Sequence, residues 1–301
     1  MALKWLKRGL AAFGLAAAAS ACTTADTTAA QQGPKPALWQ VADRDTTVYL
    51  FGTIHLLPQN YSWRSPKFEA AVQRSNALVV ETLVDEKNPA ALLGELMRLG
   101  LSSNLPPLLN RVSPDKRAAL QAAVQRSGVP MAALDRMETW AAAFTLIGTQ
   151  FRSLGLQSDQ GVETVLRQAF TAAGKPVDQL ETNSEQLSFF DTLPADAQLK
   201  LLEGAIERPE EVRQQFDGML AAWARGDVNA IAQTFNTEME GSPALEDALL
   251  RRRNANWAGW IQRRLAQPGA VMVAVGAGHL AGDASVQALL QQRGLKVTRI
   301  Q

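Results

Sequence analysis

Two stretches of the chain repeat one pattern of apolar and polar positions. Each has a continuous apolar or β-branched run, then glycine, two residues and histidine, then a helical pattern and a second apolar run. The first stretch comprises residues 47–55, 66–74 and 77–81, and the second comprises residues 270–279, 283–292 and 295–300. Continuous apolar runs are typical of strands buried on both faces. Each stretch therefore predicts a strand, a crossover helix and a parallel strand, which makes two related half-units.

Helical periodicity dominates the middle of the chain. Residues 114–125 are amphipathic, with Ser113 as the expected N-cap and proline at the first helical position. Residues 138–153 and 162–173 predict two more helices, and Gly174 is the expected stop of the second.

A third buried strand is predicted at residues 177–181, and residues 184–264 predict several further helices. We detect no second independent core. We therefore expect one α/β domain over residues 37–301, with a sheet built from the two chain ends and a largely helical insertion, or cap, over about residues 88–265.

The first 21 residues predict a signal peptide. A basic start is followed by an alanine-rich apolar run at residues 9–21. This run is shorter than the ~20 residues that a membrane-spanning helix needs. Residues 19–21 fit a small-residue cleavage site, so the mature chain would begin at Cys22.

Cys22 is the only cysteine, and it immediately follows the predicted cleavage site. The same segment resembles a lipobox, although Ala19 stands where leucine is usual. Plain secretion and lipidation of Cys22 both fit, and the placement of the sole cysteine favours lipidation. Residues 22–36 are small and polar and predict a flexible tether. We expect an exported protein, periplasmic or an outer-membrane lipoprotein of a Gram-negative-type bacterium, which touches a membrane only through lipid at Cys22.

Composition excludes several classes of function. The formal net charge is +1, which gives no electrostatic case for nucleic-acid binding, and no nucleic-acid-binding motif is present. A lone cysteine excludes a disulfide framework and a thiolate zinc site. No nucleophile elbow, Walker loop or H-E-x-x-H helix occurs.

The only two histidines, His55 and His279, both stand three residues after a glycine at the end of an apolar run. Glycine makes up 21 of 301 residues, so chance gives both histidines such a glycine with a probability of roughly 0.005. In open α/β sheets ligands bind beyond the carboxyl ends of the strands. We expect the two histidines to face one cleft, where imidazole serves as metal ligand, general base or anion partner.

Two carboxylates end predicted strands in a similar way, Glu81 and Glu181. Two histidines with one or two carboxylates suit a divalent metal such as Mn, Fe, Co or Zn. We expect His55, His279, Glu81 and Glu181 as metal ligands, with Glu81 also a candidate general base. Each glutamate taken alone is more often a solvated strand end than a ligand.

Arg253, Asn254 and Trp257 fall within about one helical turn just before the second apolar strand. Arg253 and Asn254 are candidates for binding a substrate carboxylate or for orienting a metal ligand. The alternative is a solvated basic face with tryptophan in the core.

At these residues the chain resembles the TraB/GumN family, which includes the conjugation-associated TraB and PrgY proteins, GumN from polysaccharide clusters and the animal TIKI proteases. The matching segments follow the family's order: residues 51–55, 161–163, 180–186, 253–257 and 275–279. The family usually has aspartate where this chain has Glu163.

The resemblance implies a fold similar to that of the erythromycin-esterase and ChaN-like proteins. For the TIKI branch it implies a metal-dependent peptidase that uses the paired histidines and an acidic residue, here His55, His279 and Glu81. The resulting hypothesis is a hydrolase acting on peptides or envelope proteins. Two alternatives stay open: a non-catalytic binding protein for a metal complex, haem-like ligand or peptide, and an envelope interaction protein with a vestigial site.

Overall fold

The computed structural model describes residues 33–301 apart from residues 84–88, 157 and 240–241. The predicted signal peptide, Cys22 and most of the predicted tether lie outside the described residues. Within the part of the chain that is described, no helix is long and apolar enough to cross a membrane.

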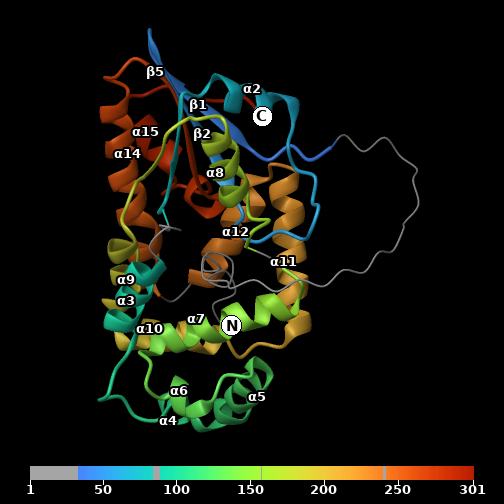
Figure 1. The fold of residues 1–301 in the computed structure, drawn as a ribbon, viewed down its shortest axis with the longest axis vertical. Helices are drawn as coiled ribbons and strands as arrows, with labels where there is room; N and C mark the ends of the chain where they lie inside the picture. The colour runs from blue at the N-terminus through green and yellow to red at the C-terminus, as the bar shows by residue number, and fades with distance from the viewer. Residues whose placement is uncertain (1–32, 84–88, 157, 240–241) are drawn as a thin grey trace, which may run out of the picture.

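A six-stranded mixed sheet occupies one end of the molecule, at the top of Figure 1, with the strand order β4-β3-β5-β2-β1-β6. The strands are β1 (Leu38–Ala42), β2 (Thr46–Thr53), β3 (Ala77–Val80), β4 (Val177–Gln179), β5 (Gly269–Gly276) and β6 (Val297–Arg299). Strands β4, β3, β5 and β2 are parallel, whereas β1 runs antiparallel to both of its neighbours. The predicted α/β class is confirmed, and so is a strand at the predicted third position, β4.

The two predicted strand–helix–strand stretches interlock in this sheet. The first is β2, α2 (Pro66–Arg74) and β3, and the second is β5, α15 (Val286–Gln292) and β6. In each the two strands run in the same direction but are not neighbours, because β5 lies between β2 and β3, and β2 and β1 lie between β5 and β6. The closer expectation, half-units arranged as in the erythromycin-esterase and ChaN-like proteins, stays a prediction.

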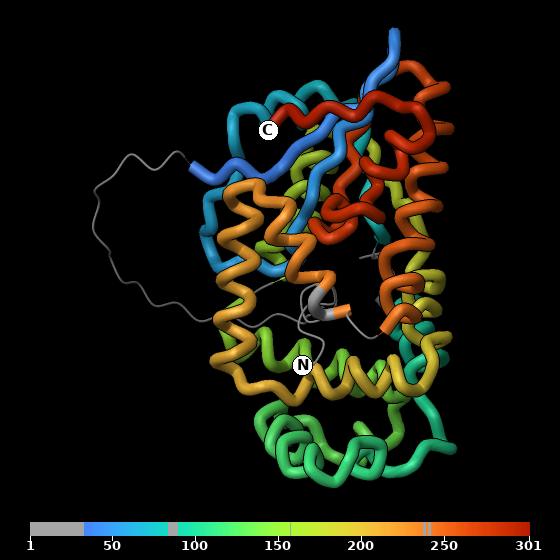
Figure 2. Tube along the Cα trace, turned by 180° about the vertical axis from the view of Figure 1, so that it is seen from behind, coloured from blue at the N-terminus to red at the C-terminus, as the bar shows by residue number. Residues whose placement is uncertain are grey.

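The sheet is covered on both faces, which explains its continuous apolar strands. Along β2, Val48 and Leu50 pack in one apolar cluster with α14 (Arg252–Arg264) and α15. Tyr49 and Phe51 point to the other face, into a cluster that includes α2 and α8 (Val162–Ala172) and continues into the cap. Alternate side chains of one strand thus enter opposite layers. Seen from behind, α14 extends along the sheet toward the cap (Figure 2).

The cap fills the other end of the molecule and reaches back to one side of the sheet (Figure 1). Its α-helices are α3 (Pro89–Gly100), α4 (Leu108–Arg111), α5 (Arg117–Ser127), α6 (Met131–Leu134), α7 (Thr139–Ser153), α9 (Asn183–Asp191), α10 (Ala195–Gly204), α11 (Pro209–Ala224), α12 (Val228–Met239) and α13 (Pro243–Glu246). Short turns of other helix types are η1 (Pro114–Lys116), η2 (Asp247–Arg251) and η3 (Ala277–Leu280). The larger of the two apolar clusters runs through the cap and one face of the sheet, so the cap and the sheet share a core.

The helix predicted from residue 114 begins there, but as a 3₁₀ turn that becomes an α-helix at Arg117. Ser113 stands at the N-cap position and makes no side-chain cap hydrogen bond. The predicted stop at Gly174 agrees with the structure, since this residue has a φ of 67° immediately after α8.

Candidate functional site

The two G-x-x-H motifs lie side by side because β2 and β5 are adjacent and parallel. In the register of this pair Thr53 stands opposite Gly276, so both chains leave the sheet at the same edge. The first motif glycine allows the second motif to approach, since a Cβ on Gly52 would lie only 3.1 Å from the Cα of Ala277. The two motifs therefore meet at the carboxyl end of the strands, and their use as one functional site stays a prediction.

His55 is held by a carboxylate from α8. Its Nδ1 lies 2.9 Å from Oε1 of Glu163, which also accepts a hydrogen bond from the hydroxyl of Thr53. Burial by itself would lower the pKa of His55, but the charge of Glu163 and its hydrogen bond outweigh this and raise the pKa to about 9. The other carboxylate oxygen, Oε2 of Glu163, is buried and has no hydrogen-bond partner among the described residues.

His279 has a neutral partner instead. Asn254 donates its Nδ2 hydrogen to the carbonyl of Ala284 at 2.8 Å, so its Oδ1 faces Nδ1 of His279 at 2.6 Å. The imidazole therefore carries its hydrogen on Nδ1 and presents the lone pair of Nε2, which lies 3.2 Å from Nη1 of Arg253. Burial and the charge of Arg253 lower the pKa of His279 to about 3. The ring also packs on Trp257, with centroids 4.4 Å apart.

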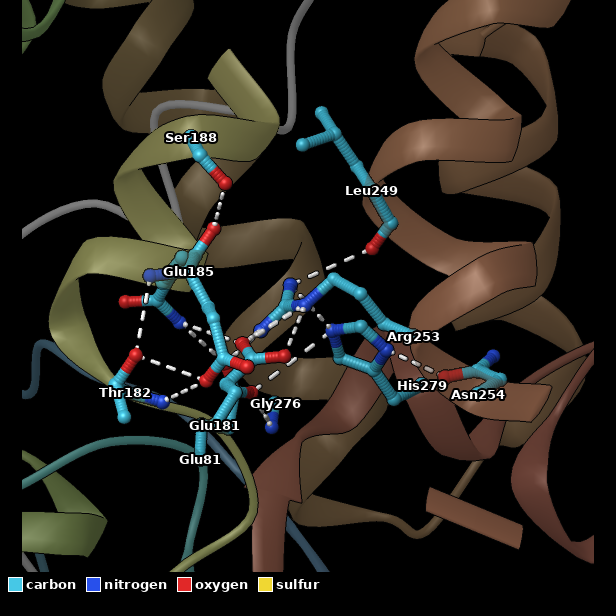
Figure 3. A network of polar contacts seen from close by, with 11 residues as sticks. Glu81, Glu181, Thr182, Glu185, Ser188, Leu249, Arg253, Asn254, Gly276 and His279 are labelled. Carbon is cyan, nitrogen blue, oxygen red and sulfur yellow. Dashed lines mark hydrogen bonds and ion pairs between the residues drawn. The ribbon is translucent and has the colours of Figure 1, made fainter. Parts of the chain in front are cut away.

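Arg253 is the centre of a buried ion network (Figure 3). Its Nη2 donates to Oε2 of Glu81 at 2.6 Å, and its Nε donates to Oε1 of Glu181 at 2.9 Å. Gln186 on α9 donates to both carboxylates, at 3.1 Å to Glu81 and 3.2 Å to Glu181. The guanidinium lies over the ring of Trp257, with Cζ 4.7 Å from the centroid. The guanidinium donors thus face the carboxylates of Glu81 and Glu181 or the lone pair on Nε2 of His279.

The pKa values of the two glutamates in this network are shifted in opposite directions. Burial alone would raise the pKa of Glu81, but the charge of Arg253, the histidines and the backbone N–H of Gly276 hold it well below its usual range. Burial raises the pKa of Glu181, and attraction to Arg253 offsets only part of that effect. Glu81 is therefore the more firmly ionised carboxylate of the pair.

Three side chains converge on the backbone of Gly276. A Cβ at this glycine would lie 3.2 Å from Oε1 of Glu81, 3.6 Å from Cδ2 of His279 and 3.8 Å from Nε2 of His55. Oε1 of Glu81 accepts one hydrogen bond, from N of Gly276 at 2.7 Å, and lies 3.8 Å from Nε2 of His279. Gly276 thus keeps open a small space bordered by two imidazoles and one carboxylate.

The predicted ligands are residue types that bind divalent metals, but their arrangement fits a metal ion less well. Nδ1 of each histidine is fixed by an acceptor, which is the usual setting of a metal-ligating imidazole, but Nε2 of His279 contacts Nη1 of Arg253. Yet among the described residues no group of three or more His, Cys, Asp or Glu side chains is placed to hold a metal ion. Glu81 lies with the two histidines. Glu181 lies beyond it, bonded to Arg253 and Gln186.

The remaining predicted residues, Arg253 and Asn254, contact the site from α14. Arg253 and Asn254 are buried on α14 and bind the side chains of Glu81 and His279, whereas the expectation that they orient metal ligands stays a prediction. Their predicted contact with substrate stays a prediction. The basic helix face is therefore not solvated at Arg253, and Trp257 is in the core.

Two contributors were not identified as site residues from the sequence, Glu163 and Gln186. The only signal for either was its place in segments that resemble the family. A third, Gly161, is needed for close packing: a Cβ there would lie 2.1 Å from the carbonyl oxygen of His55. The next residue, Val162, donates its N–H to the carbonyl of Ile54 at 3.0 Å, which fixes the start of α8 against the first motif.

Fold and site together define a class: α/β proteins in which two histidines at the ends of neighbouring parallel strands meet beside a buried arginine–carboxylate network. The chain belongs to the TraB/PrgY/gumN family, whose sequence profile matches residues 37–299. The family resemblance inferred from the motifs is thereby confirmed.

Relatives cover most of the chain. It is 27% identical over 248 residues to the uncharacterized protein YbaP of Escherichia coli, covering 81% of this chain and 87% of that protein. YbaP of Shigella flexneri matches with the same values. An uncharacterized protein of Treponema pallidum is 24% identical over 273 residues, covering 85% of this chain and 80% of that protein. No solved structure matches significantly.

Proposed function

We propose that this protein is a metal-dependent hydrolase in which His55, His279 and Glu81 would hold a divalent cation. The observation that carries the proposal is the matched support of the two imidazoles, with Nδ1 of His55 fixed by Glu163 and Nδ1 of His279 fixed by Asn254. Such outer partners orient metal-ligating histidines and leave Nε2 available. The space over Gly276, which a Cβ would fill, supports the same assignment.

A bound divalent cation would supply Lewis-acid polarisation of a substrate carbonyl. The residues around it have separable tasks. Glu81, held as a carboxylate, is better suited to binding a cation than to accepting a proton, because its pKa is well below its usual range. Arg253 keeps Glu81 in place and contacts Nε2 of His279, so a cation at that nitrogen would compete with the guanidinium. At His55 a cation would compete with a proton.

The substrate class and location rest on sequence. The resemblance to the TIKI branch supports a peptidase, and the predicted signal peptide supports an envelope location. We propose peptides or envelope proteins as substrates, Mn, Co, Fe or Zn as the metal, and export to the periplasm or to the outer membrane through lipid at Cys22. The family profile is consistent with this proposal and sets the broader class.

The test of hydrolysis uses residues 22–301 with Cys22→Ser, purified without added histidines and supplied with each metal in turn. Mass spectrometry of a peptide library would detect cleavage. We expect metal-dependent products from the parent and a loss of at least about 100-fold in Glu81→Gln. Glu210→Gln, on the exposed start of α11, is the matched control and should cleave normally. A parent that retains stoichiometric metal but cleaves nothing would contradict hydrolysis.

A second candidate is a binding protein without turnover, which would hold a metal complex, haem-like ligand or peptide. The observation that favours it is the saturation of Glu81 and Glu181 by Arg253 and Gln186, together with the lack of a ready three-residue metal group among the described residues. It is distinguished by a ligand that copurifies in a one-to-one ratio and is recovered unchanged after incubation.

A further inference from the structure

A cavity of about 320 Å³ lies between α3 and α7, in the cap. Its walls are mainly apolar and include Leu93, Leu96, Met97, Trp140 and Phe144. None of the residues that line it belongs to the histidine site. Small-molecule sites are concave, largely apolar and about 300–1,000 Å³ in volume, so this cavity has room for a small ligand.

One wall leaves apolar surface in water. Leu93, Met97 and Leu101 are 58%, 55% and 41% exposed, and they are the large hydrophobic side chains that stand out as exposed in the described chain. They recur every fourth residue along and just after α3, so they lie on one face beside the cavity. Contiguous exposed apolar surface that borders a hollow marks a ligand or partner site.

The cavity has a single charged lining residue, Arg152. Its side chain, near the end of α7, is exposed and makes no ion pair or hydrogen bond with any described residue. The guanidinium reaches back toward the cavity, since its Nη1 lies 4.0 Å from the position of a Cβ on Gly148. The other lining residues include no carboxylate to neutralise it. The cavity thus combines a mainly apolar interior with a cation at its edge that has no partner among the described residues.

We propose that this cavity binds a free medium-chain fatty carboxylate, with the acyl chain between α3 and α7 and the carboxylate at Arg152. Guanidinium groups bind carboxylates through paired hydrogen bonds. Leucine and methionine walls adapt to a flexible unbranched chain. The charge complementarity selects an anionic amphiphile over a neutral one, and the cavity is independent of the proposed metal site.

The binding test is calorimetric titration with carboxylates of six to twelve carbons, below their micellar concentrations, and with the alcohols of equal length. Affinity should rise about fourfold for each added CH₂ until the cavity is full. The carboxylate should bind more tightly than the alcohol, and added salt should reduce that difference.

Two matched pairs of variants locate the ligand. Gly148→Leu fills the cavity and should weaken binding at least about tenfold, whereas Gly218→Leu, at an exposed interior position of α11, should bind as the parent does. Both replace glycine in a helix interior with a better helix former, so both should fold. Arg152→Gln should weaken carboxylate binding about two- to fivefold and leave the alcohol unaffected. Arg126→Gln, at an exposed position of α5, should change neither.

Three results would overturn the proposal. The first is no binding of any chain length by the parent. The second is equal binding by Gly148→Leu and the parent. The third is a parent dimer in sedimentation that Met97→Lys abolishes, because the same face would then be covered by a second copy of the chain.

Discussion

His55 and His279 occupy matching places at the ends of β2 and β5, yet their surroundings are opposite. His55 is 19% exposed and paired with the anionic Glu163, and its pKa is raised to about 9. His279 is 7% exposed, paired with the neutral amide of Asn254 and next to Arg253, and its pKa is lowered to about 3. A repeated motif therefore determines where each imidazole lies, while partners from elsewhere in the chain determine its charge.

The largest expected effect comes from removing the cation beside His279. Arg253→Met would leave Glu81 and Glu181 buried without their counter-charge, which should lower the free energy of unfolding by about 3–5 kcal/mol. Urea unfolding measures this value. Arg213→Met, which breaks an exposed pair with Asp217 on α11, is the control and should cost under about 1 kcal/mol. A loss below about 1 kcal/mol in Arg253→Met would show that the network is not desolvated.

The next effect concerns the packing behind His55. Gly161→Ala would place a methyl group against the carbonyl of His55, where backbone must move, and should cost about 1–3 kcal/mol. Gly218→Ala meets nothing within 4 Å in a helix interior and should be neutral or stabilising. Thermal unfolding compares the two. Equal stability of both variants would mean that the start of α8 does not pack tightly against the backbone of His55.

Exchanging the partners should bring the two histidines closer in charge. In metal-free protein, Glu163→Gln removes the anion that raises the pKa of His55, and this pKa should fall by about two units. Asn254→Asp adds an anion beside His279 and should raise its pKa by about one to three units. Titration by NMR is direct because the chain has only two histidines. Unchanged pKa values would contradict the assigned partners.

The smallest expected effect comes from removing the hydroxyl of Thr53, which shares the carboxylate of Glu163 with His55. Thr53→Val removes one hydrogen bond to Glu163 at nearly constant shape and should cost about 0.5–1.5 kcal/mol in unfolding free energy. Thr149→Val, on the cap helix α7, removes only a local bond to a helix carbonyl and is the comparison. If Thr149→Val lost more unfolding free energy than Thr53→Val, the hydrogen bond to Glu163 would not be a significant stabilising contact.

The sequence predicted the motif pair because local rules govern it. Buried parallel strands leave continuous apolar runs, and strand ends carry the histidines, so the shared edge followed from the pattern around Gly52 and Gly276. The role of Glu163 did not follow, since it depends on how α8 packs after a long stretch of cap. Strand β1 was not predicted, because residues 38–42 are a short run that carries no motif.

The charge pairing within the site also could not be predicted from the sequence pattern. Glu181 was expected beside the histidines because it follows a strand, but β4 is at the sheet edge, with β3 between it and β5. Arg253 occupies the intervening position and bridges the two carboxylates. Which cation neutralises a pair of buried glutamates depends on the three-dimensional packing of α14, not on any local spacing.

The central claim is that the two histidines share one metal site, and elemental analysis tests it most directly. The proteins compared are residues 22–301 with Cys22→Ser, purified without chelator or added histidines, and the same chain with His55→Ala and His279→Ala. The account predicts near-stoichiometric divalent metal in the first and none in the second, with both folded by circular dichroism. No retained metal in the first, even after reloading with Mn, Co, Fe or Zn, would contradict it and leave the histidines as structural or ligand-binding groups.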